Sequence, residues 1–267
     1  MCSSDLFPKN GSVLCAERKR RLFQKLRKSP ERKTIMHCVR EVTDDLYWVG
    51  ANDKRLHLFE SIHPLEDGVS YNSYLLLDEK TVLFDTADKS VYEQFIENVE
   101  YVLGDRPLDY MVINHLEPDH AASINQIVLR HPDVKIVSTE KAEMMFHQFG
   151  YDPGRDFITV KEGDTVKFGK HEVTFLAAPM VHWPEAMVTL DLKNGVLFSA
   201  DAFGSFKLLD GALFADEVPF KTEWIDEARR YYTNIVSKYR PHRSGNPAKA
   251  ARQTKEAAAK HNAETWC

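Results

Sequence analysis

The stretch His115-Leu-Glu-Pro-Asp-His120 is the most informative part of this sequence, because it gathers four metal-binding side chains with the spacing H-x-E-x-D-H. An apolar run at residues 108–113 precedes it and predicts a buried strand, and residues 121–130 carry apolar side chains at helical spacing. The cluster is therefore expected where a strand ends and a helix begins, which is where open α/β sheets build active sites. His115 with Glu117, and Asp119 with His120, can face one cavity as two groups, a pattern that suits two neighbouring metal ions.

The same residues admit a plainer interpretation as a polar loop. Asp119 could be the N-cap of the following helix, and a single polar residue in a loop usually has no further role. Four such residues in six positions, directly behind a buried strand, favour the metal site.

Composition narrows the class of protein. The 267 residues, 43% of them hydrophobic, are enough for one large domain or two small ones. A net charge of −5 and a pI near 6.1 argue against nucleic-acid binding. The four cysteines form no C-x-x-C pair, which favours a reducing cytoplasm over a disulfide framework or a thiolate zinc site. Apolar runs are too short for a membrane span, so no membrane partner is expected.

The chain divides into three regions. Residues 1–35 carry ten lysines and arginines against three acidic residues and are interpreted as a disordered or non-native extension. Residues 36–240 alternate strand and helix patterns, which predicts a single α/β domain of sheets covered by helices. Residues 241–267 contain no Val, Ile, Leu or Phe and are interpreted as an aberrant polar tail.

Periodicity and turn signals place the elements of the central domain. Ser90 with Glu93 predicts a capping box at the start of a helix, and Asn194-Gly195 predicts a hairpin. Strands are expected at residues 45–49, 71–77, 81–84, 134–137, 157–160, 165–168, 172–177, 187–190 and 196–199, and helices at residues 90–103, 141–149 and 224–239.

Two further candidate ligands, His182 and Asp201, also follow predicted strands. Each alone would be an ordinary loop residue, but their shared placement at strand ends favours a common site. A carboxylate in such a position can bridge two metals. One metal would then have His115, Glu117, His182 and Asp201, and the other Asp119, His120 and Asp201. Imidazole suits zinc and iron alike, while the additional anionic oxygens favour iron.

Residues 36–239 closely resemble the metallo-β-lactamase-like domain of the flavodiiron proteins. The stretches that carry the resemblance are spread along the domain: Asp45-Leu-Tyr-Trp-Val-Gly-Ala-Asn-Asp53, Gly68-Val-Ser-Tyr-Asn-Ser-Tyr-Leu75, Asn114-His-Leu-Glu-Pro-Asp-His-Ala-Ala122, Ala178-Pro-Met-Val-His-Trp-Pro-Glu185, Leu197-Phe-Ser-Ala-Asp-Ala-Phe-Gly204 and Leu213-Phe-Ala-Asp-Glu217. Hydrolases of this superfamily usually show H-x-H-x-D-H, whereas Glu117 stands at the second position here, as in the diiron oxidoreductases.

The resemblance implies a metallo-β-lactamase-like αββα sandwich with two iron ions at its mouth. His115, Glu117 and His182 would hold one iron, Asp119 and His120 the other, and Asp201 would bridge them. The family reduces dioxygen to water, nitric oxide to nitrous oxide, or both. Its members form head-to-tail homodimers in which FMN of one subunit feeds the diiron site of the other.

The sequence departs from the family pattern in two places. The last iron ligand of the family is a histidine in a His-Gly-Pro context, and nothing after Tyr239 matches it; His261 lies at a similar distance but in a different context. This predicts a frame change or truncation near Arg240. The flavodoxin-like FMN domain of the family is also absent, so an outside electron donor such as rubredoxin or a flavodoxin-type protein is expected.

Two alternatives to the diiron reductase remain open at this point. One is a zinc-dependent hydrolase on the same fold, with a metal-bound hydroxide as nucleophile. The other is an inactive remnant that binds one metal or none, because loss of a ligand weakens a metal site.

Overall fold

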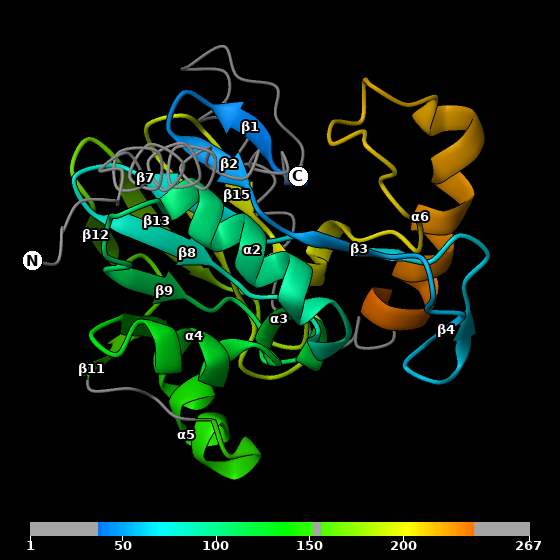
Figure 1. The fold of residues 1–267 in the computed structure, drawn as a ribbon. Coiled ribbons are helices and arrows are strands. Elements are labelled where there is room, and N and C mark those ends of the chain that lie inside the picture. The colour runs from blue at the N-terminus through cyan, green and yellow to red at the C-terminus, as the bar shows by residue number, and fades with distance from the viewer. Residues whose placement is uncertain (1–36, 152–155, 238–267) are drawn as a thin grey trace, which may run out of the picture. The chain divides into compact units, whose positions relative to one another are not determined.

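The computed structural model describes residues 37–151 and 156–237, and its secondary-structure elements all lie in the compact unit Cys38–Cys267 (Figure 1). The predictions for residues 1–35 and 241–267, including His261 as a possible ligand, lie outside the described residues.

The larger sheet has seven strands in the order β1-β2-β7-β8-β9-β10-β11. The strands from β1 to β8 pair antiparallel and those from β8 to β11 pair parallel. Their bounds are β1 Arg40–Thr43, β2 Leu46–Trp48, β7 Tyr74–Leu77, β8 Thr81–Phe84, β9 Tyr110–Val112, β10 Lys135–Thr139 and β11 Asp156–Val160. Because parallel strands end at the same edge of a sheet, the segments that follow β8, β9 and β10 meet at one edge.

The second sheet is antiparallel, with the order β12-β13-β14-β15. Its strands are β12 Thr165–Lys167, β13 Glu172–Ala177, β14 Met187–Asp191 and β15 Leu197–Phe198. The hairpin predicted at Asn194-Gly195 is confirmed, since Thr189 pairs with Phe198 across it and Gly195 has a φ of 72°. Two small two-stranded sheets complete the strands: β3 Ala51–Asp53 with β6 Val69–Tyr71, and β4 Leu58–Phe59 with β5 His63–Pro64.

The helical segments are η1 Lys89–Val91, α2 Tyr92–Leu103, α3 Pro118–Ala121, α4 Ile124–Arg130, α5 Glu140–Phe149, η2 Ala200–Phe203, η3 Phe220–Trp224, α6 Ile225–Tyr231 and η4 Tyr232–Val236. Helix α5 ends at Phe149, as predicted, and Gly150 follows it in the left-handed conformation. The predicted capping box is wrong: Asp88 accepts from the Ser90 backbone N–H (2.8 Å), so the helical segment begins earlier, with η1. Among the described helices, none is both long and apolar enough to cross a membrane.

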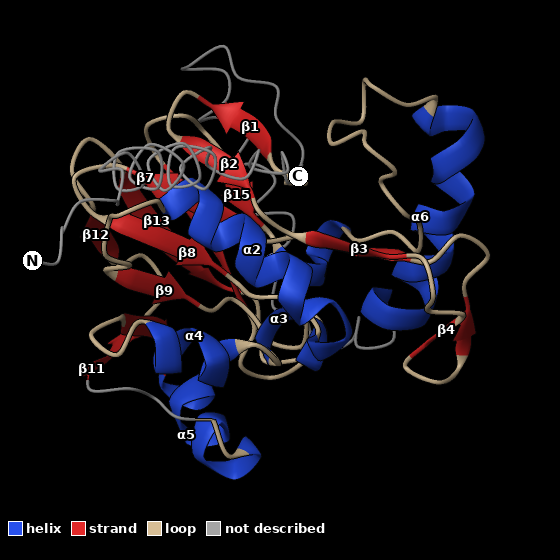
Figure 2. Cartoon of the chain, in the orientation of Figure 1, coloured by secondary structure: helices blue, strands red, loops and turns tan. Residues whose placement is uncertain are grey.

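The inner strands β7, β8 and β10 of the seven-stranded sheet are largely buried, and their successive side chains point to opposite faces that are both covered, whereas the edge strands β1 and β11 are partly exposed. Leu75 and Leu83 belong to one apolar cluster with Phe95 of α2, and α2, α4 and α5 pack on this face (Figure 1). Phe84 points to the other face, where its ring stacks on Phe198 of the second sheet with centroids 3.8 Å apart. Helices therefore lie outside the packed sheets (Figure 2), which confirms the predicted α/β class.

The predicted strand at residues 71–77 is interrupted. Tyr71 ends β6 and Tyr74 begins β7, and between them Ser73 donates its hydroxyl proton to the Asp85 carbonyl (2.9 Å). This interruption redirects the chain from the small β3–β6 sheet into the large one, beside the residues that follow β8.

Candidate metal centre

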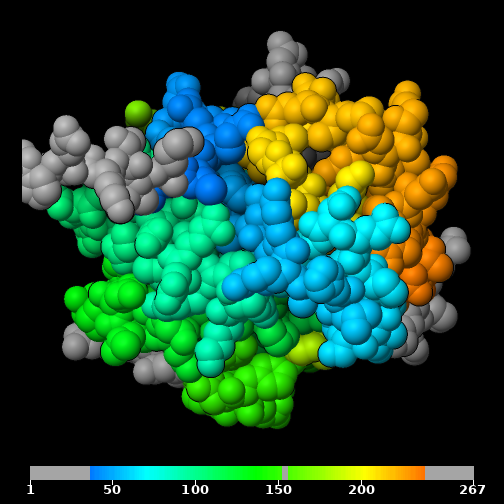
Figure 3. Space-filling model, turned by 45° about the vertical axis from the view of Figure 1, so that its right-hand side comes forward, coloured from blue at the N-terminus to red at the C-terminus, as the bar shows by residue number. Residues whose placement is uncertain are grey.

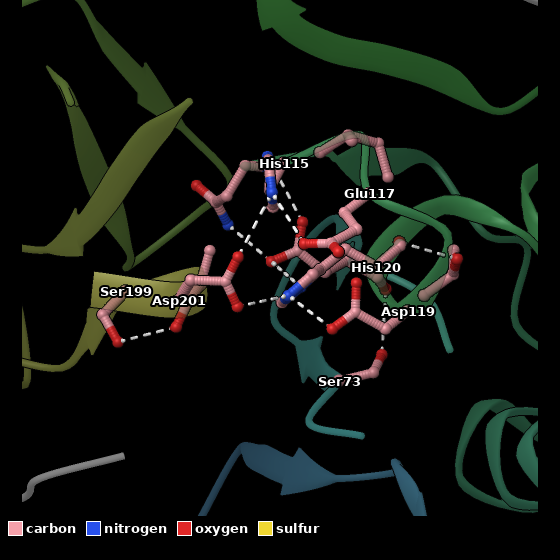
Figure 4. A network of polar contacts seen from close by, with 12 residues as sticks. Ser73, His115, Glu117, Asp119, His120, Ser199 and Asp201 are labelled. Carbon is pink, nitrogen blue, oxygen red and sulfur yellow. Dashed lines mark hydrogen bonds and ion pairs between the residues drawn. The ribbon is translucent and has the colours of Figure 1, made fainter. Parts of the chain in front are cut away.

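The H-x-E-x-D-H stretch spans the junction between β9 and α3. Pro118 is the first residue of α3, a position that proline favours because its φ is preset and it lacks an N–H. Glu117 is consequently the N-cap in extended conformation, and Asp119 lies in the first helical turn. The alternative that made Asp119 the N-cap is wrong. His115 and Glu117 therefore extend from an extended segment, while Asp119 and His120 extend from a helix (Figure 4).

His115, Glu117, His182 and Asp201 form a first buried group whose candidate ligand atoms all lie within 4.8 Å of one another. Glu117 Oε2 lies 2.7 Å from His182 Nε2 and 3.4 Å from His115 Nε2. Asp201 Oδ2 lies 3.2 Å from His115 Nε2 and 3.4 Å from His182 Nε2. Two imidazoles and two carboxylates thus converge on one point.

Asp119, His120 and Asp201 form the second group. His120 Nε2 lies 3.4 Å from Asp119 Oδ2 and 3.1 Å from Asp201 Oδ1. Asp201 belongs to both groups and presents Oδ2 to the first and Oδ1 to the second. The six residues predicted from sequence are thus brought together in the two sets expected, with the one carboxylate common to both. Figure 4 labels these residues except His182.

Two segments that are connected to strands of the second sheet contain the remaining candidate ligands, His182 and Asp201. His182 lies in the loop of residues 178–186 between β13 and β14, as expected from its place after a strand. Asp201 was expected at the end of a strand but lies in η2, three residues after β15 ends at Phe198. The short helical turn directs the Asp201 carboxylate inwards, where it is 4% exposed.

Unsatisfied polar atoms mark the centre of the cluster. Among the described residues, His115 Nε2, Asp119 Oδ1 and Asp201 Oδ2 are buried and make no hydrogen bond. Burying such atoms without partners is costly, and all three belong to the two groups of candidate ligands. A mixed set of imidazole nitrogens and carboxylate oxygens fits a pair of divalent transition-metal ions.

Burial and mutual charge shift the pKa of each member. Burial is the largest influence on His182 and lowers its pKa, but Asp201 and Glu117 together raise the pKa to about 9. Burial opposes ionisation of Glu117, yet the neighbouring imidazoles of His115 and His182 bring its pKa down to about 2. Burial, assisted by the charge of Asp201, raises the pKa of Asp119 to about 7. A bound cation would take the place of the protons that these groups share.

Four residues around the cluster were missed by the sequence analysis. Glu185 Oε1 accepts from His115 Nδ1–H (2.8 Å), and Tyr231 donates its hydroxyl proton to Asp201 Oδ1 (2.6 Å). Asp85 accepts from the Asn114 backbone N–H (2.6 Å), and its Oδ2 lies 3.8 Å from His120 Nδ1. Burial and the neighbouring Glu117 raise the pKa of Glu60 to about 7. Of these four residues, only Asp85 could have been identified from the sequence, because it is an acidic residue directly after the strand predicted at residues 81–84.

A cavity of about 100 Å³ adjoins the second group and is lined in part by Asp119, His120, Asp201 and Tyr231. The segment that contains β4 and β5 lies beside the segments that contain η2 and α6 on the surface near it (Figure 3), and Phe59 of β4 packs edge-on against Phe206 with centroids 5.6 Å apart. A space of this size admits a molecule of only a few atoms.

Comparisons with known proteins agree with this geometry. A family model described as "ODP family beta lactamase" matches residues 69–239. The chain is 38% identical to the anaerobic nitric oxide reductase flavorubredoxin of Vibrio vulnificus over 200 residues, which cover 74% of this chain and 40% of the relative. It is 37% identical to the flavorubredoxin homolog of Escherichia coli O157:H7 over 74% of this chain and 48% of the relative.

Solved structures of flavodiiron-type proteins are also similar to this chain. The rubredoxin oxygen:oxidoreductase of Desulfovibrio gigas superposes with a TM-score of 0.73 at 32% identity, covering 83% of this chain and 53% of that one. The flavodiiron protein from Giardia intestinalis superposes with a TM-score of 0.72 at 26% identity, covering 87% and 53%. The chain thus spans roughly two fifths to half of the length of the relatives it matches.

Proposed function

This chain belongs to the ODP family of beta-lactamase-like proteins, and on that premise we propose that it is the core of a non-haem diiron oxidoreductase that reduces dioxygen to water, nitric oxide to nitrous oxide, or both. The observation that carries the proposal is the Asp201 carboxylate, whose two oxygens face two separate groups of candidate ligands. The flavorubredoxin and flavodiiron relatives support the choice of chemistry.

We assign His115, Glu117 and His182 to one iron, Asp119 and His120 to the other, and Asp201 to both. The unsatisfied buried atoms of these residues support the assignment. Glu117 supports iron over zinc, because a carboxylate supplies a hard anionic oxygen where a zinc hydrolase has another imidazole. When bound, a ferrous pair would supply two electrons and open coordination positions for a diatomic gas.

The residues around the cluster suit this chemistry. Reducing two molecules of nitric oxide to nitrous oxide and water consumes two electrons and two protons. Glu60, whose side chain is 34% exposed, lies close enough to Glu117 to be a candidate proton carrier, because in the metal-free protein burial and Glu117 raise its pKa to about 7. The buried Tyr231 hydroxyl donates to Asp201 and keeps that carboxylate oriented. The cavity of about 100 Å³ beside Asp201 and Tyr231 is of a size that suits a diatomic gas.

The partners are inferred in the same way. We propose that electrons come from rubredoxin or from an FMN-carrying flavodoxin-type protein; the name of the Desulfovibrio gigas relative supports the first of these donors. We also propose that the chain forms a homodimer, as its resemblance to the flavodiiron proteins implies. We further propose that it is cytoplasmic, because the sequence has no pattern of cysteines that indicates a disulfide framework.

The test uses the full chain purified without oxygen from cells supplied with iron and zinc. We expect about two irons per chain by plasma mass spectrometry. After reduction and removal of excess reductant, we expect nitrous oxide from added nitric oxide, at up to one molecule per diiron pair. Asp201→Ala should lose both properties, whereas His147→Gln, on the exposed side of α5, should keep them. Bound zinc with hydrolysis of a thioester or phosphodiester, or failure to bind metal at all, would refute the proposal.

A further inference from the structure

The loop of residues 178–186 reaches the metal centre with two side chains, of which His182 is a candidate ligand and Glu185 is not. The Glu185 carboxylate is 2% exposed and lies on the far side of the His115 ring from the cluster. Its Oε1 accepts from His115 Nδ1–H (2.8 Å) and from the Leu116 backbone N–H (3.0 Å). The buried Glu185 Oε1 therefore binds both the His115 ring and the backbone of the next residue, Leu116.

This contact decides which nitrogen of His115 faces the cluster. With the Nδ1 proton directed at Glu185, the lone pair is on Nε2, which lies 3.4 Å from Glu117 Oε2 and 3.2 Å from Asp201 Oδ2. Ligating histidines generally donate their other N–H to such a partner, which fixes both tautomer and ring orientation. On the basis of the proposed metal centre, we propose that Glu185 is a positioning residue that holds His115 as an Nε2 ligand and couples it to the His182 loop.

The coupling rests on backbone contacts at both sides of Glu185. Thr139, at the end of β10, donates its hydroxyl proton to the Glu185 carbonyl (3.1 Å). The Met187 N–H donates to the Asn114 carbonyl (3.0 Å), directly before His115. The loop that carries His182 is thus fixed to the segment that carries His115, and the Glu185 side chain closes this connection next to the ligand.

Stability alone does not explain a carboxylate in this position. Among the described residues, Glu185 Oε2 is buried and makes no hydrogen bond. A buried carboxylate with one unsatisfied oxygen costs folding free energy that an apolar side chain of similar size would not. Its negative charge instead increases the basicity of His115, which strengthens a metal bond.

The second group has no equally close partner of this kind. His120 Nδ1 makes no hydrogen bond among the described residues, and the nearest carboxylate oxygen, on Asp85, lies 3.8 Å away. Loss of Glu185 should therefore weaken the first metal position and leave the second largely unchanged. This selectivity separates a positioning role from general destabilisation.

The experiment compares Glu185→Leu, Glu185→Gln and the wild-type chain by anaerobic cobalt(II) titration against a chromophoric chelator. Leu removes the acceptor, whereas Gln keeps a neutral oxygen for His115 and Leu116. Glu162→Gln is the matched control, because exposed Glu162 accepts from the Ala177 backbone N–H (2.6 Å) at the end of β13 but lies outside both groups. We expect two binding steps in the wild type and in Glu162→Gln.

In Glu185→Leu we expect one step to weaken by roughly ten- to a hundredfold, with a changed visible spectrum for that ion and an unchanged second step. Glu185→Gln should recover most of the loss. In zinc-loaded protein with ¹⁵N-labelled histidine, the slowly exchanging His115 Nδ1 proton should be present in the wild type and absent in Glu185→Leu.

The outcomes distinguish the two proposals. If the wild type binds two ions and Glu185→Leu binds them with equal affinity, or loses both steps together, the positioning role is refuted while the metal centre stands. Persistence of the His115 Nδ1 proton signal in Glu185→Leu would refute it as well. If the wild-type chain binds no cobalt, both proposals fail.

Discussion

Replacing His171 tests whether a buried ion cluster at the opposite ends of β13 and β14 from the metal centre holds the two sheets together. His171 is 1% exposed and directly precedes β13. Its Nδ1 lies 3.0 Å from Asp191 Oδ2, at the end of β14, and its Nε2 lies 2.9 Å from Asp45 Oδ2, directly before β2 of the other sheet. Lys193 donates to the same Asp45 oxygen (2.7 Å) and lies 2.8 Å from His171 Nε2.

The magnitude follows from these contacts. Removing one partner of a buried ion pair costs about 3–5 kcal/mol. We expect the lower end because the Asp45 side chain is 23% exposed and keeps Lys193 as a partner, and because Lys193 Nζ, 2.8 Å from His171 Nε2, repels the protonated ring. His171→Leu should therefore lose about 3 kcal/mol of unfolding free energy at pH 6, which corresponds to roughly 6–12 °C in Tm for a domain of this size. The exposed His147→Gln in α5 is the control and should change Tm by less than about 2 °C.

The loss should depend on pH with a definite sign. Burial lowers the pKa of His171, but hydrogen bonds to Asp191 and Asp45 outweigh it and raise the pKa above the usual value. A raised pKa in the folded state means that the stabilisation is fully present below the unfolded pKa of about 6.5 and is lost as pH rises through the folded pKa. Thermal unfolding followed by circular dichroism at pH 6 and pH 9.5 should show a smaller difference between wild type and His171→Leu at the higher pH. A difference that is independent of pH, or below about 1 kcal/mol at pH 6, would refute the reasoning.

Three further predictions concern the metal centre. Zinc affinity, measured by chelator competition, should rise between about pH 6 and pH 9. The pKa is raised to about 7 for Asp119 and to about 9 for His182, so protons compete with the metal below these values. An affinity that does not change with pH would contradict this. Tyr231→Phe removes the 2.6 Å hydrogen bond to Asp201 and should cost about 2 kcal/mol in urea unfolding with a shifted cobalt(II) spectrum, and an unshifted spectrum would mean that Tyr231 does not orient Asp201. Gly204→Ala would place a Cβ 2.5 Å from the Tyr231 ring and should cost about 1–3 kcal/mol in urea unfolding, and an unchanged free energy of unfolding would mean that the ring moves aside at no cost.

The clustering of the six candidate metal ligands could be predicted because most of its signal is local. Four of them lie within six residues, and the apolar run before them indicated a strand end. His182 and Asp201 follow strands too, so the rule that sites form at strand ends extended to them. Most strands of the two larger sheets were found because alternation and buried apolar runs depend on near neighbours in the sequence, whereas β1 and the short strands β3, β4 and β5 were missed. Helix α5, which ends at Phe149 as predicted, was found by the same kind of local signal.

The supporting residues could not be predicted because their partners are distant in the sequence. Glu185 is 70 residues from His115, and Asp45 is 126 residues from His171. Neither residue belongs to a repeating pattern, so only the sheet topology brings it to its partner. The error of placing the N-cap at Asp119 has another cause, because it could have been avoided from the sequence. Proline favours the first helical position, so Pro118 already implied that Glu117 is the N-cap.

The β13–β14 hairpin connects these two kinds of residue. At one end, His171 and Asp191 attach it to the large sheet through Asp45. At the other end, its connecting loop carries His182 into the first group of ligands and Glu185 against His115. At the His171 end, the basic side chains of His171 and Lys193 pair with the carboxylates of Asp45 and Asp191. At the end near the candidate ligands, buried oxygen and nitrogen atoms make no hydrogen bond among the described residues. The hairpin is therefore anchored at the end that needs no cation, and a cation bound at the proposed metal centre would offset the energetic cost of its other end.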